Sequence, residues 1–257
     1  MTHAEERART LRRIRDSLQE LVADGIDYLP RAVRVRPVAA PVTPVPSTFR
    51  PRVAPLAAPT VVSEVAGDKA QLLAAVRAEI GDCRRCRLCE KRKEIVFGEG
   101  AADARVVFVG EGPGEEEDKS GRPFVGRAGE LLTKMIEAVG WRREDVYICN
   151  IVKCRPPGNR DPQPDEIATC QPFLEAQIRA IAPQAIITLG KPAISTLLGR
   201  PVAITKERGQ WREWQGVPVM PTYHPAYLLR NYTRETRQAV WDDLRAVRER
   251  VEGSRAP

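Results

Sequence analysis

The stretch RVVFVGEGPGEEEDKSGRPFVGRAGELL, residues 105–132, contains the strand, loop and helix start that decide the fold. It opens with a run of apolar, mostly β-branched residues, which is typical of a fully buried strand. A loop rich in glycine follows, and then the amphipathic segment AGELLTKMIEAVG at 128–140, which predicts a helix that ends at Gly140. A buried strand followed by a helix is the repeating unit of a parallel sheet.

The same alternation continues to the C-terminus. Strands are expected at 145–152, 185–190 and 217–225, and helices at 68–80, 164–183, 191–199 and 234–252. This pattern predicts the α/β class: a three-layer α/β/α sandwich with a central, mainly parallel four-stranded sheet. Ligands of such sheets bind beyond the carboxyl ends of the strands, so the residues that follow each strand are the candidates for function.

The chain before residue 67 has a different character. Residues 1–28 carry apolar side chains at helical spacing and predict an amphipathic helix of unassigned role, a candidate contact for a protein partner. Residues 29–66 are rich in proline and alanine without a sustained period, so we expect a disordered linker. The folded domain is expected at 67–252, followed by a short tail at 253–257.

Composition narrows the class of protein. The 257-residue chain has 42% hydrophobic residues, enough for a substantial core, and no apolar run of the about 20 residues that span a membrane. No signal peptide is recognisable, so we expect a cytoplasmic protein, in which clustered cysteines bind metal more often than they form disulfides. The net charge of +7 favours a polyanionic partner, although a basic surface can also serve solubility alone.

The residues after the strands suit a flat, uncharged ligand. Gly110 and Gly112 suggest a dinucleotide loop, but the sixth position of that pattern is Glu115 and its acidic neighbours would repel a pyrophosphate. The glycines instead indicate a tight loop whose backbone N–H groups face a small molecule. Asn150 ends the second strand and His224 follows the fourth. An amide, an imidazole and an aromatic side chain there fit a nucleobase.

Six cysteines raise a second question. Three lie at three-residue spacing in DCRRCRLCEKR, residues 82–92, and Cys154 and Cys170 follow at a distance. Two close thiols and two distant ones make a four-cysteine set, which either zinc or a [4Fe-4S] cluster accepts. Spacing does not separate these two, and unrelated buried thiols are the remaining alternative.

Three segments carry a resemblance to a known family. GEGPGEEEDKSGRPFVGRAGELL, YICNIVKCRPPGNRDPQPDE and HPAYLLR resemble the signature segments of family 4 uracil-DNA glycosylases, the iron–sulfur branch of that superfamily. The likeness covers about residues 75–250. It implies an enzyme of base excision repair that removes uracil from single- and double-stranded DNA by hydrolysing the N-glycosidic bond, which leaves an abasic site.

The resemblance also implies a cofactor. In that family pattern a [4Fe-4S] cluster is held by four cysteines, here Cys83, Cys86, Cys154 and Cys170. Cys89 and Cys149 fall at positions that the family does not need, although Cys89 could replace a ligand if its loop turned differently. Strand alternation places Cys149 on the face opposite Asn150, where it packs as a small apolar group.

Roles in base recognition follow from the same resemblance. Phe124 would stack on the flipped uracil, Asn150 would pair with O4 and N3–H, and His224 would hydrogen-bond O2 as negative charge develops. Glu111 and Gly112 would line the pocket. Gly112 takes the place of the aspartate that positions water in family 1 enzymes, so Glu111 ranks first, ahead of Glu117 and Asp118, among the carboxylates that could handle the water.

DNA contacts are expected from two segments. The loop after His224 would insert a wedge into the base stack through Tyr227, Leu228, Leu229 and Arg230. Phosphate contacts are expected from basic side chains that include Lys153 and Arg155. A related subfamily that is trapped covalently on DNA has an inserted loop with a histidine after the second motif; this chain has none, so we expect turnover.

Two alternatives remain from the sequence. One is a non-catalytic iron–sulfur protein that binds DNA or senses redox state, and the other is a zinc-stabilised hydrolase of a nucleotide-like substrate. We expect a monomer that acts near the nucleoid.

Overall fold

The computed structural model of the chain describes residues 68–253. The predicted N-terminal helix and linker lie outside the described residues, as does the C-terminal tail after Gly253. Within 68–253, no helix is long and apolar enough to cross a bilayer.

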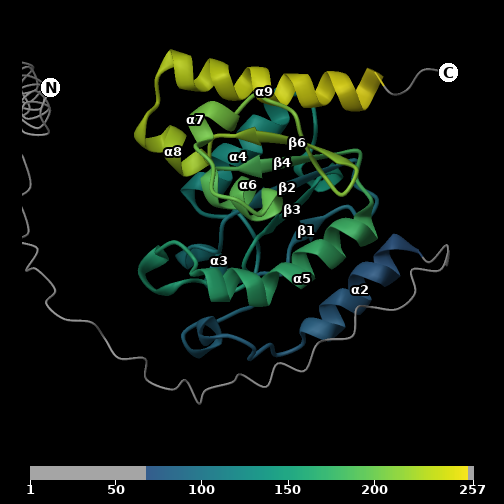
Figure 1. Ribbon diagram of the computed structural model, residues 1–257, viewed down its shortest axis with the longest axis vertical. Helices are drawn as coiled ribbons and strands as arrows, with labels where there is room; N and C mark the ends of the chain where they lie inside the picture. The colour runs from purple at the N-terminus through teal and green to yellow at the C-terminus, as the bar shows by residue number, and fades with distance from the viewer. Residues whose placement is uncertain (1–67, 254–257) are drawn as a thin grey trace, which may run out of the picture. The chain divides into compact units, whose positions relative to one another are not determined.

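A six-stranded sheet forms the centre of the described domain (Figure 1). Its strands are β1 (Glu99–Gly100), β2 (Val106–Gly110), β3 (Tyr147–Asn150), β4 (Ala185–Leu189), β5 (Arg212–Trp214) and β6 (Val217–Thr222). The order is β1-β3-β2-β4-β6-β5, and the four inner strands are parallel while both edge strands pair antiparallel. The four predicted strands are therefore the inner ones. The prediction of four strands in all was wrong, because edge strands of two and three residues carry no readable period.

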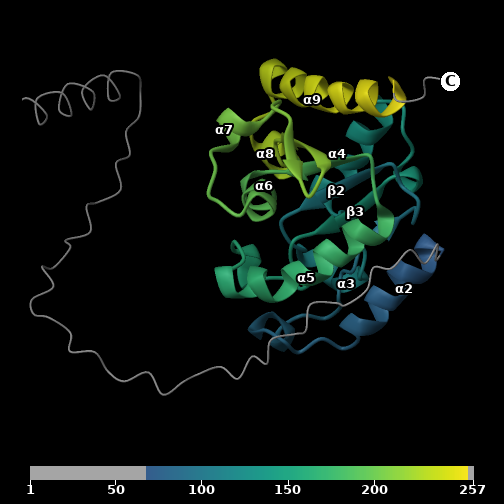
Figure 2. The ribbon, with the colours of Figure 1, turned by 45° about the vertical axis from the view of Figure 1, so that its right-hand side comes forward.

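Helices cover both faces of the sheet. They are α2 (Lys69–Ile80), α3 (Glu115–Ser120), α4 (Arg127–Ala138), α5 (Pro164–Ile181), α6 (Lys191–Leu198), α7 (Ile204–Glu207), α8 (Pro225–Arg230) and α9 (Arg234–Gly253). Helices α2 and α5 lie on one side of the sheet and α9 on the other (Figures 1 and 2). The chain thus forms the predicted three-layer α/β/α sandwich.

Alternation along β2 explains why both faces are covered. Val107 and Val109 pack in one core cluster with apolar residues of α5 and α6, whereas Val106 and Phe108 pack in a second cluster with residues of α4 and α9. Every residue of this strand is buried. A strand that is apolar on both faces needs a helical layer on each side, which is why it reads as a continuous apolar run.

Local signals begin the helices. The Asp68 side chain accepts a hydrogen bond from the Ala70 N–H at 3.1 Å and caps α2. The acidic run from Glu115 opens α3, where the helix dipole favours negative charge. The sequence predicts a loop here, because a six-residue helix is too short to show a period.

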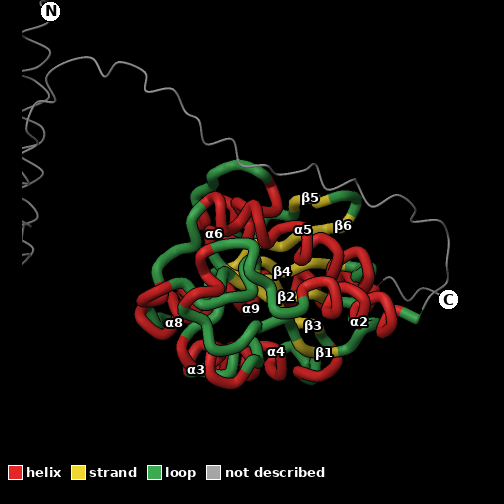
Figure 3. The backbone as a smooth tube through the Cα atoms, turned by 90° about the horizontal axis from the view of Figure 1, so that it is seen from below, coloured by secondary structure: helices red, strands yellow, loops and turns green. Residues whose placement is uncertain are grey.

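The strand order creates a crevice at β2. The chain passes from β2 to β3 on one side and then crosses to β4 on the other side of β2, as the end-on arrangement of strands in Figure 3 shows. The loops that leave β2 therefore diverge from those on both sides, and the crevice lies beyond the carboxyl ends of the parallel strands.

Candidate active site

A cavity of about 430 Å³ lies beyond these carboxyl ends. The five residues that the sequence placed around a base all line it: Glu111, Gly112, Phe124, Asn150 and His224. They come from the loop after β2, the end of β3 and the turn between β6 and α8. The size suits a small planar ligand rather than a duplex, because ligand pockets span roughly 300–1,000 Å³.

Gly110 makes room for two side chains that line the cavity, Asn150 and Phe124. It pairs with Asn150 across β2 and β3. A Cβ atom at Gly110 would lie 2.4 Å from Oδ1 of Asn150 and 2.4 Å from Cζ of Phe124. The amide and the ring thus close on the space that a side chain would fill.

The Asn150 amide carries an unused acceptor. Its Oδ1 atom is buried and has no hydrogen-bond partner among the described residues. Leaving such an atom unpaired costs about 1–3 kcal/mol, so folded proteins rarely keep one without a reason. A ligand N–H donor in the cavity would supply the missing partner.

Backbone constraint holds Phe124 at the cavity. Its φ of 51° lies in the left-handed region, which an aromatic residue seldom adopts. Gly129 packs against it so closely that a Cβ there would lie 2.0 Å from the Phe124 carbonyl. The ring centroid lies 5.7 Å from that of His224, with the planes tilted by 36°. Strain of this kind is characteristic of functional sites.

Two neighbouring carboxylates, of which Glu117 also lines the cavity, accept hydrogen bonds from the backbone. Glu117 accepts hydrogen bonds at 2.9–3.1 Å from three backbone N–H groups, those of Gly114, Val125 and Gly126. Asp118 is buried and accepts from the Lys93 N–H at 2.9 Å. Both side chains hold loops together, and Glu115 and Glu116 pair with Lys119 at the surface. No such contact of the Glu111 carboxyl is among the described hydrogen bonds and ion pairs.

Burial and a neighbouring acid change the ionisation of Glu111. Burial, followed by the nearby carboxyl of Asp161, raises the pKa of Glu111 to about 7. Both side chains line the cavity. Asp161 could not be identified from the sequence, because its position in the loop after β3 has no feature that distinguishes it from other surface acids.

His224 is a neutral donor. Its Nδ1 atom accepts a hydrogen bond from the Ala226 N–H at 3.1 Å and caps α8, so the ring proton is on Nε2. Burial, followed by the charge of Arg230, lowers the pKa of His224 to about 4. The imidazole is therefore uncharged at neutral pH and presents an N–H group.

A second cavity collects five thiols. Cys83, Cys86, Cys89, Cys154 and Cys170 line it together with apolar side chains such as Leu88 and Phe173. Cys149 is fully buried in β3 and packs in the core instead. The cysteines near residue 86 thus lie beside those of the later segments, as a shared cofactor requires, and Cys89 lies with them.

The chemistry of this cavity fits an iron–sulfur cluster. Burial raises the pKa of Cys154 to about 12 and also raises that of Cys170, so thiolates there need a cationic partner. Within 68–253, no three His, Cys, Asp or Glu side chains converge on a single ion. A [4Fe-4S] cluster needs no such convergence, because each iron takes one thiolate. Arg92 donates to Sγ of Cys154 at 3.5 Å and balances part of the negative charge.

The structure corrects two expected DNA contacts. Lys153 is buried and its Nζ atom donates to the Asn150 carbonyl at 2.8 Å, so it braces β3 and does not reach a phosphate. Leu228 is buried in the core, whereas Leu229 is 39% exposed. Helix α8 turns Leu228 toward the core and Leu229 toward solvent, whereas the sequence predicted one loop that contains both.

The remaining predicted contacts are accessible. Arg230 is exposed and lines the base cavity, and Tyr227 packs on Tyr223 with ring centroids 4.8 Å apart. Arg155 lies 3.5 Å from Glu115 and donates to Asn159 at 2.8 Å, at the surface of the loop after β3.

Comparisons with known proteins show which sequences this chain is similar to. The family model described as the uracil DNA glycosylase superfamily matches residues 97–245. The type-4 uracil-DNA glycosylase of Thermotoga maritima is 54% identical over 176 residues, which cover 68% of this chain and 92% of that protein. The type-4 enzyme of Sulfurisphaera tokodaii is 45% identical over 68% of this chain and 82% of its own length. A type-5 enzyme of Pyrobaculum aerophilum is 33% identical over 57% of this chain and 72% of its own.

Proposed function

The chain belongs to the uracil DNA glycosylase superfamily, and from this membership we propose that it is a DNA-repair glycosylase that excises uracil. The reaction hydrolyses the N-glycosidic bond and leaves an abasic site in single- or double-stranded DNA. The uracil nucleotide must leave the stack to enter a cavity of this size, which costs a few kcal/mol in duplex DNA and less in a single strand.

The observation that carries the proposal is the unpaired Oδ1 atom of Asn150. In our proposal it accepts the N3–H of uracil while the amide nitrogen donates to O4. Cytosine presents the opposite pattern of donor and acceptor, so it would leave both amide atoms unpaired and is rejected. Phe124 stacks on the base that occupies this position.

His224 and Glu111 have separate roles in the chemical step: His224 stabilises the departing base and Glu111 accepts the proton of water. The Nε2–H of His224 donates to uracil O2, and this bond strengthens as the electron pair of the C1′–N1 bond moves into the base. Water then forms a bond to C1′ and gives its proton to the carboxylate of Glu111. A general base works best when its pKa lies near the working pH, and the pKa of Glu111 is about 7.

The cysteine cavity is the second part of the proposal. Cys83, Cys86, Cys154 and Cys170 would hold a [4Fe-4S] cluster, which serves as a structural cross-link between their segments. Cys154 lies four residues after Asn150, so the cross-link stiffens the loop that leaves the base cavity. Replacing any of the four by alanine should remove iron and bleach the protein. The changes Cys89→Ala and Cys149→Ala are the controls that keep colour.

The proposal also covers the DNA wedge, the oligomeric state and the residues before the folded domain. Leu229 and Arg230 enter the gap that the flipped nucleotide leaves, and the protein acts as a monomer in the cytoplasm on nucleoid DNA. Residues 1–28 are the candidate contact for a protein partner, and residues 1–66 are dispensable for excision. A truncated chain that begins at residue 67 should therefore keep full activity on a short oligonucleotide.

The direct test uses a labelled oligonucleotide with one uracil, incubated with the protein and cleaved with alkali. Strand cleavage at the uracil, and none in matched strands with thymine or cytosine, is the expected result. A purified, iron-loaded protein that binds this DNA and releases no uracil would instead act as the non-catalytic sensor.

A further inference from the structure

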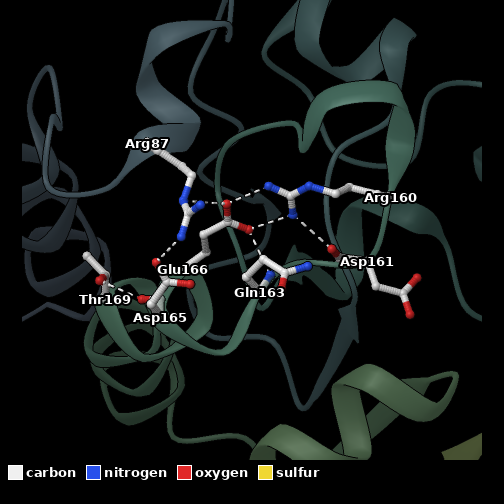
Figure 4. A network of polar contacts seen from close by, with 7 residues as sticks. All are labelled: Arg87, Arg160, Asp161, Gln163, Asp165, Glu166 and Thr169. Carbon is white, nitrogen blue, oxygen red and sulfur yellow. Dashed lines mark hydrogen bonds and ion pairs between the residues drawn. The ribbon is translucent and has the colours of Figure 1, made fainter. Parts of the chain in front are cut away.

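A buried carboxylate links the base cavity to the cysteine segment. Glu166, in the first turn of α5, has a side chain with 0% exposure and lies at the centre of the polar network in Figure 4. The guanidinium group of Arg160 makes a bidentate contact with this carboxylate, at 2.6 Å to Oε1 and 2.8 Å to Oε2. The Gln163 N–H donates to Oε2 at 2.8 Å. Two-pronged contacts of this kind are strong and fix orientation.

One end of the network reaches the cysteines. Arg87, the residue after Cys86, lies 3.5 Å from Oε1 of Glu166 and donates to Asp165 at 2.6 Å. Arg87 and Asp165 are each 59% exposed, so solvent weakens their pair. The contact between Arg160 and Glu166, whose side chains are 33% and 0% exposed, is less open to solvent and carries most of the constraint.

The other end holds the wall of the base cavity. We define the rim loop as residues 155–163; four of its side chains, Pro156, Asn159, Arg160 and Asp161, line the cavity. Arg160 also donates to the Asp161 carbonyl at 2.9 Å, which fixes the backbone where the Asp161 side chain begins. The loop contains one short 3-10 turn, Pro157–Asn159, in which Gly158 and Asn159 have positive φ values of 65° and 54°.

We propose that Glu166 is a positioning residue, which clamps the rim loop through Arg160 so that Asp161 stays beside Glu111 as the second carboxyl group of the water site. Glu166 does not line the cavity and therefore acts through the loop. The inference rests on the proposed function, because it takes Glu111 as the group that handles water.

Glu111 and Asp161 together act on the attacking water. Burial and the nearby carboxyl of Asp161 raise the pKa of Glu111, which suits its carboxylate to the role of general base. In the reaction, the water oxygen forms the bond to C1′ while the electron pair of the C1′–N1 bond leaves with uracil. The water proton passes to the carboxylate of Glu111, beside which the rim loop holds Asp161. Loss of the geometry should slow this step and leave DNA binding unchanged.

The test compares three variants of the full, iron-loaded chain. Glu166→Gln keeps the shape of the side chain but loses the charge that Arg160 grips, and Asp161→Asn removes the positioned group. The third variant carries both changes. The matched control is Glu175→Gln, on the same helix, whose carboxylate pairs with Arg179 at 2.9 Å and does not line the cavity.

The measurements separate positioning from folding. Iron per chain, binding to DNA with a non-cleavable uracil analogue, and the rate constant and amplitude of single-turnover excision are measured for each variant. Displacement of a reacting group by about 1 Å can cost about 100-fold in rate. We expect about a 10-fold loss of rate constant for Glu166→Gln, with iron, binding and amplitude unchanged. The double variant should be no slower than Asp161→Asn alone, since residues that act through one another are not additive.

Three outcomes would overturn the inference. These are a normal rate in Glu166→Gln, a loss confined to amplitude or iron, and a double variant whose losses multiply. If Glu166→Gln does not fold, Arg160→Lys replaces it, because lysine keeps the charge but not the two-pronged contact. A wild-type chain that releases no uracil would instead refute the proposed function.

Discussion

Substituting Gly110 by alanine tests the geometry of base recognition with a single methyl group. The added carbon would lie 2.4 Å from Oδ1 of Asn150 and 2.4 Å from Cζ of Phe124, about 1 Å closer than the 3.4 Å at which ordinary contact begins. The φ angle of Gly110 is not positive, so alanine fits the backbone and the effect comes from the methyl group alone. The amide and the ring must therefore separate.

The expected loss of rate and stability follows from how far these two contacts lie below the ordinary contact distance. Overpacking of this kind costs about 1–3 kcal/mol of folding free energy, which a stable domain can tolerate. Misplacing a recognition group by about 1 Å costs about 100-fold in rate. We expect a folded, iron-containing protein whose single-turnover excision is about 100-fold slower and whose affinity for the uracil analogue is reduced.

The control for this experiment is Gly126→Ala. A Cβ atom at Gly126 would meet its nearest neighbour at 3.5 Å, an ordinary contact, and should leave excision close to wild type. A Gly110→Ala protein that excises uracil at the wild-type rate would show that Asn150 and Phe124 do not recognise the base in this arrangement.

Three further substitutions test the remaining groups. His224→Ala should slow single-turnover excision about 100- to 1000-fold with little change in DNA binding, because its donor meets the base as charge develops; a defect wholly in binding would contradict this role. Asn150→Asp removes the donor to O4, so the ratio of uracil to cytosine excision should fall, and an unchanged ratio would exclude the amide from discrimination. Because the pKa of Glu111 is raised to about 7, its carboxylate fraction grows as pH rises through 7. Wild-type excision should rise over that range, and Glu111→Gln should be slower and lose this limb; a limb that persists in the variant would assign it to another group.

The central fold could be predicted because burial leaves a pattern in the sequence. The inner strands are apolar on both faces and alternate with helices, so their type and order were readable. The edge strand β1 has two residues, and the pairing that makes it a strand is with β3, 47 or more residues later. Tertiary pairing of this kind leaves no local signal. The short helices α3, α7 and α8 were not predicted either, because so few residues show no period.

The site residues also fall into those that the sequence could identify and those that it could not. Asn150 and His224 were identifiable because polar residues directly after buried strands must lie at the carboxyl edge of a parallel sheet. Lys153 and Leu228 were misplaced because exposure depends on how a loop turns. The contribution of Asp161 depends on proximity to Glu111 across the cavity, which only the folded chain reveals.

The origin of the site in three separate loops has a consequence for refolding. The base cavity needs the loop after β2, the loop after β3 and the turn after β6, and β6 joins the sheet by pairing with β4 and β5. Contacts between residues so distant along the chain form slowly, because each closes a large loop. Secondary structure should therefore return before excision does when the denatured protein is diluted into buffer. With iron and sulfide supplied for the cluster, the regain of uracil release follows the entry of β6 into the sheet.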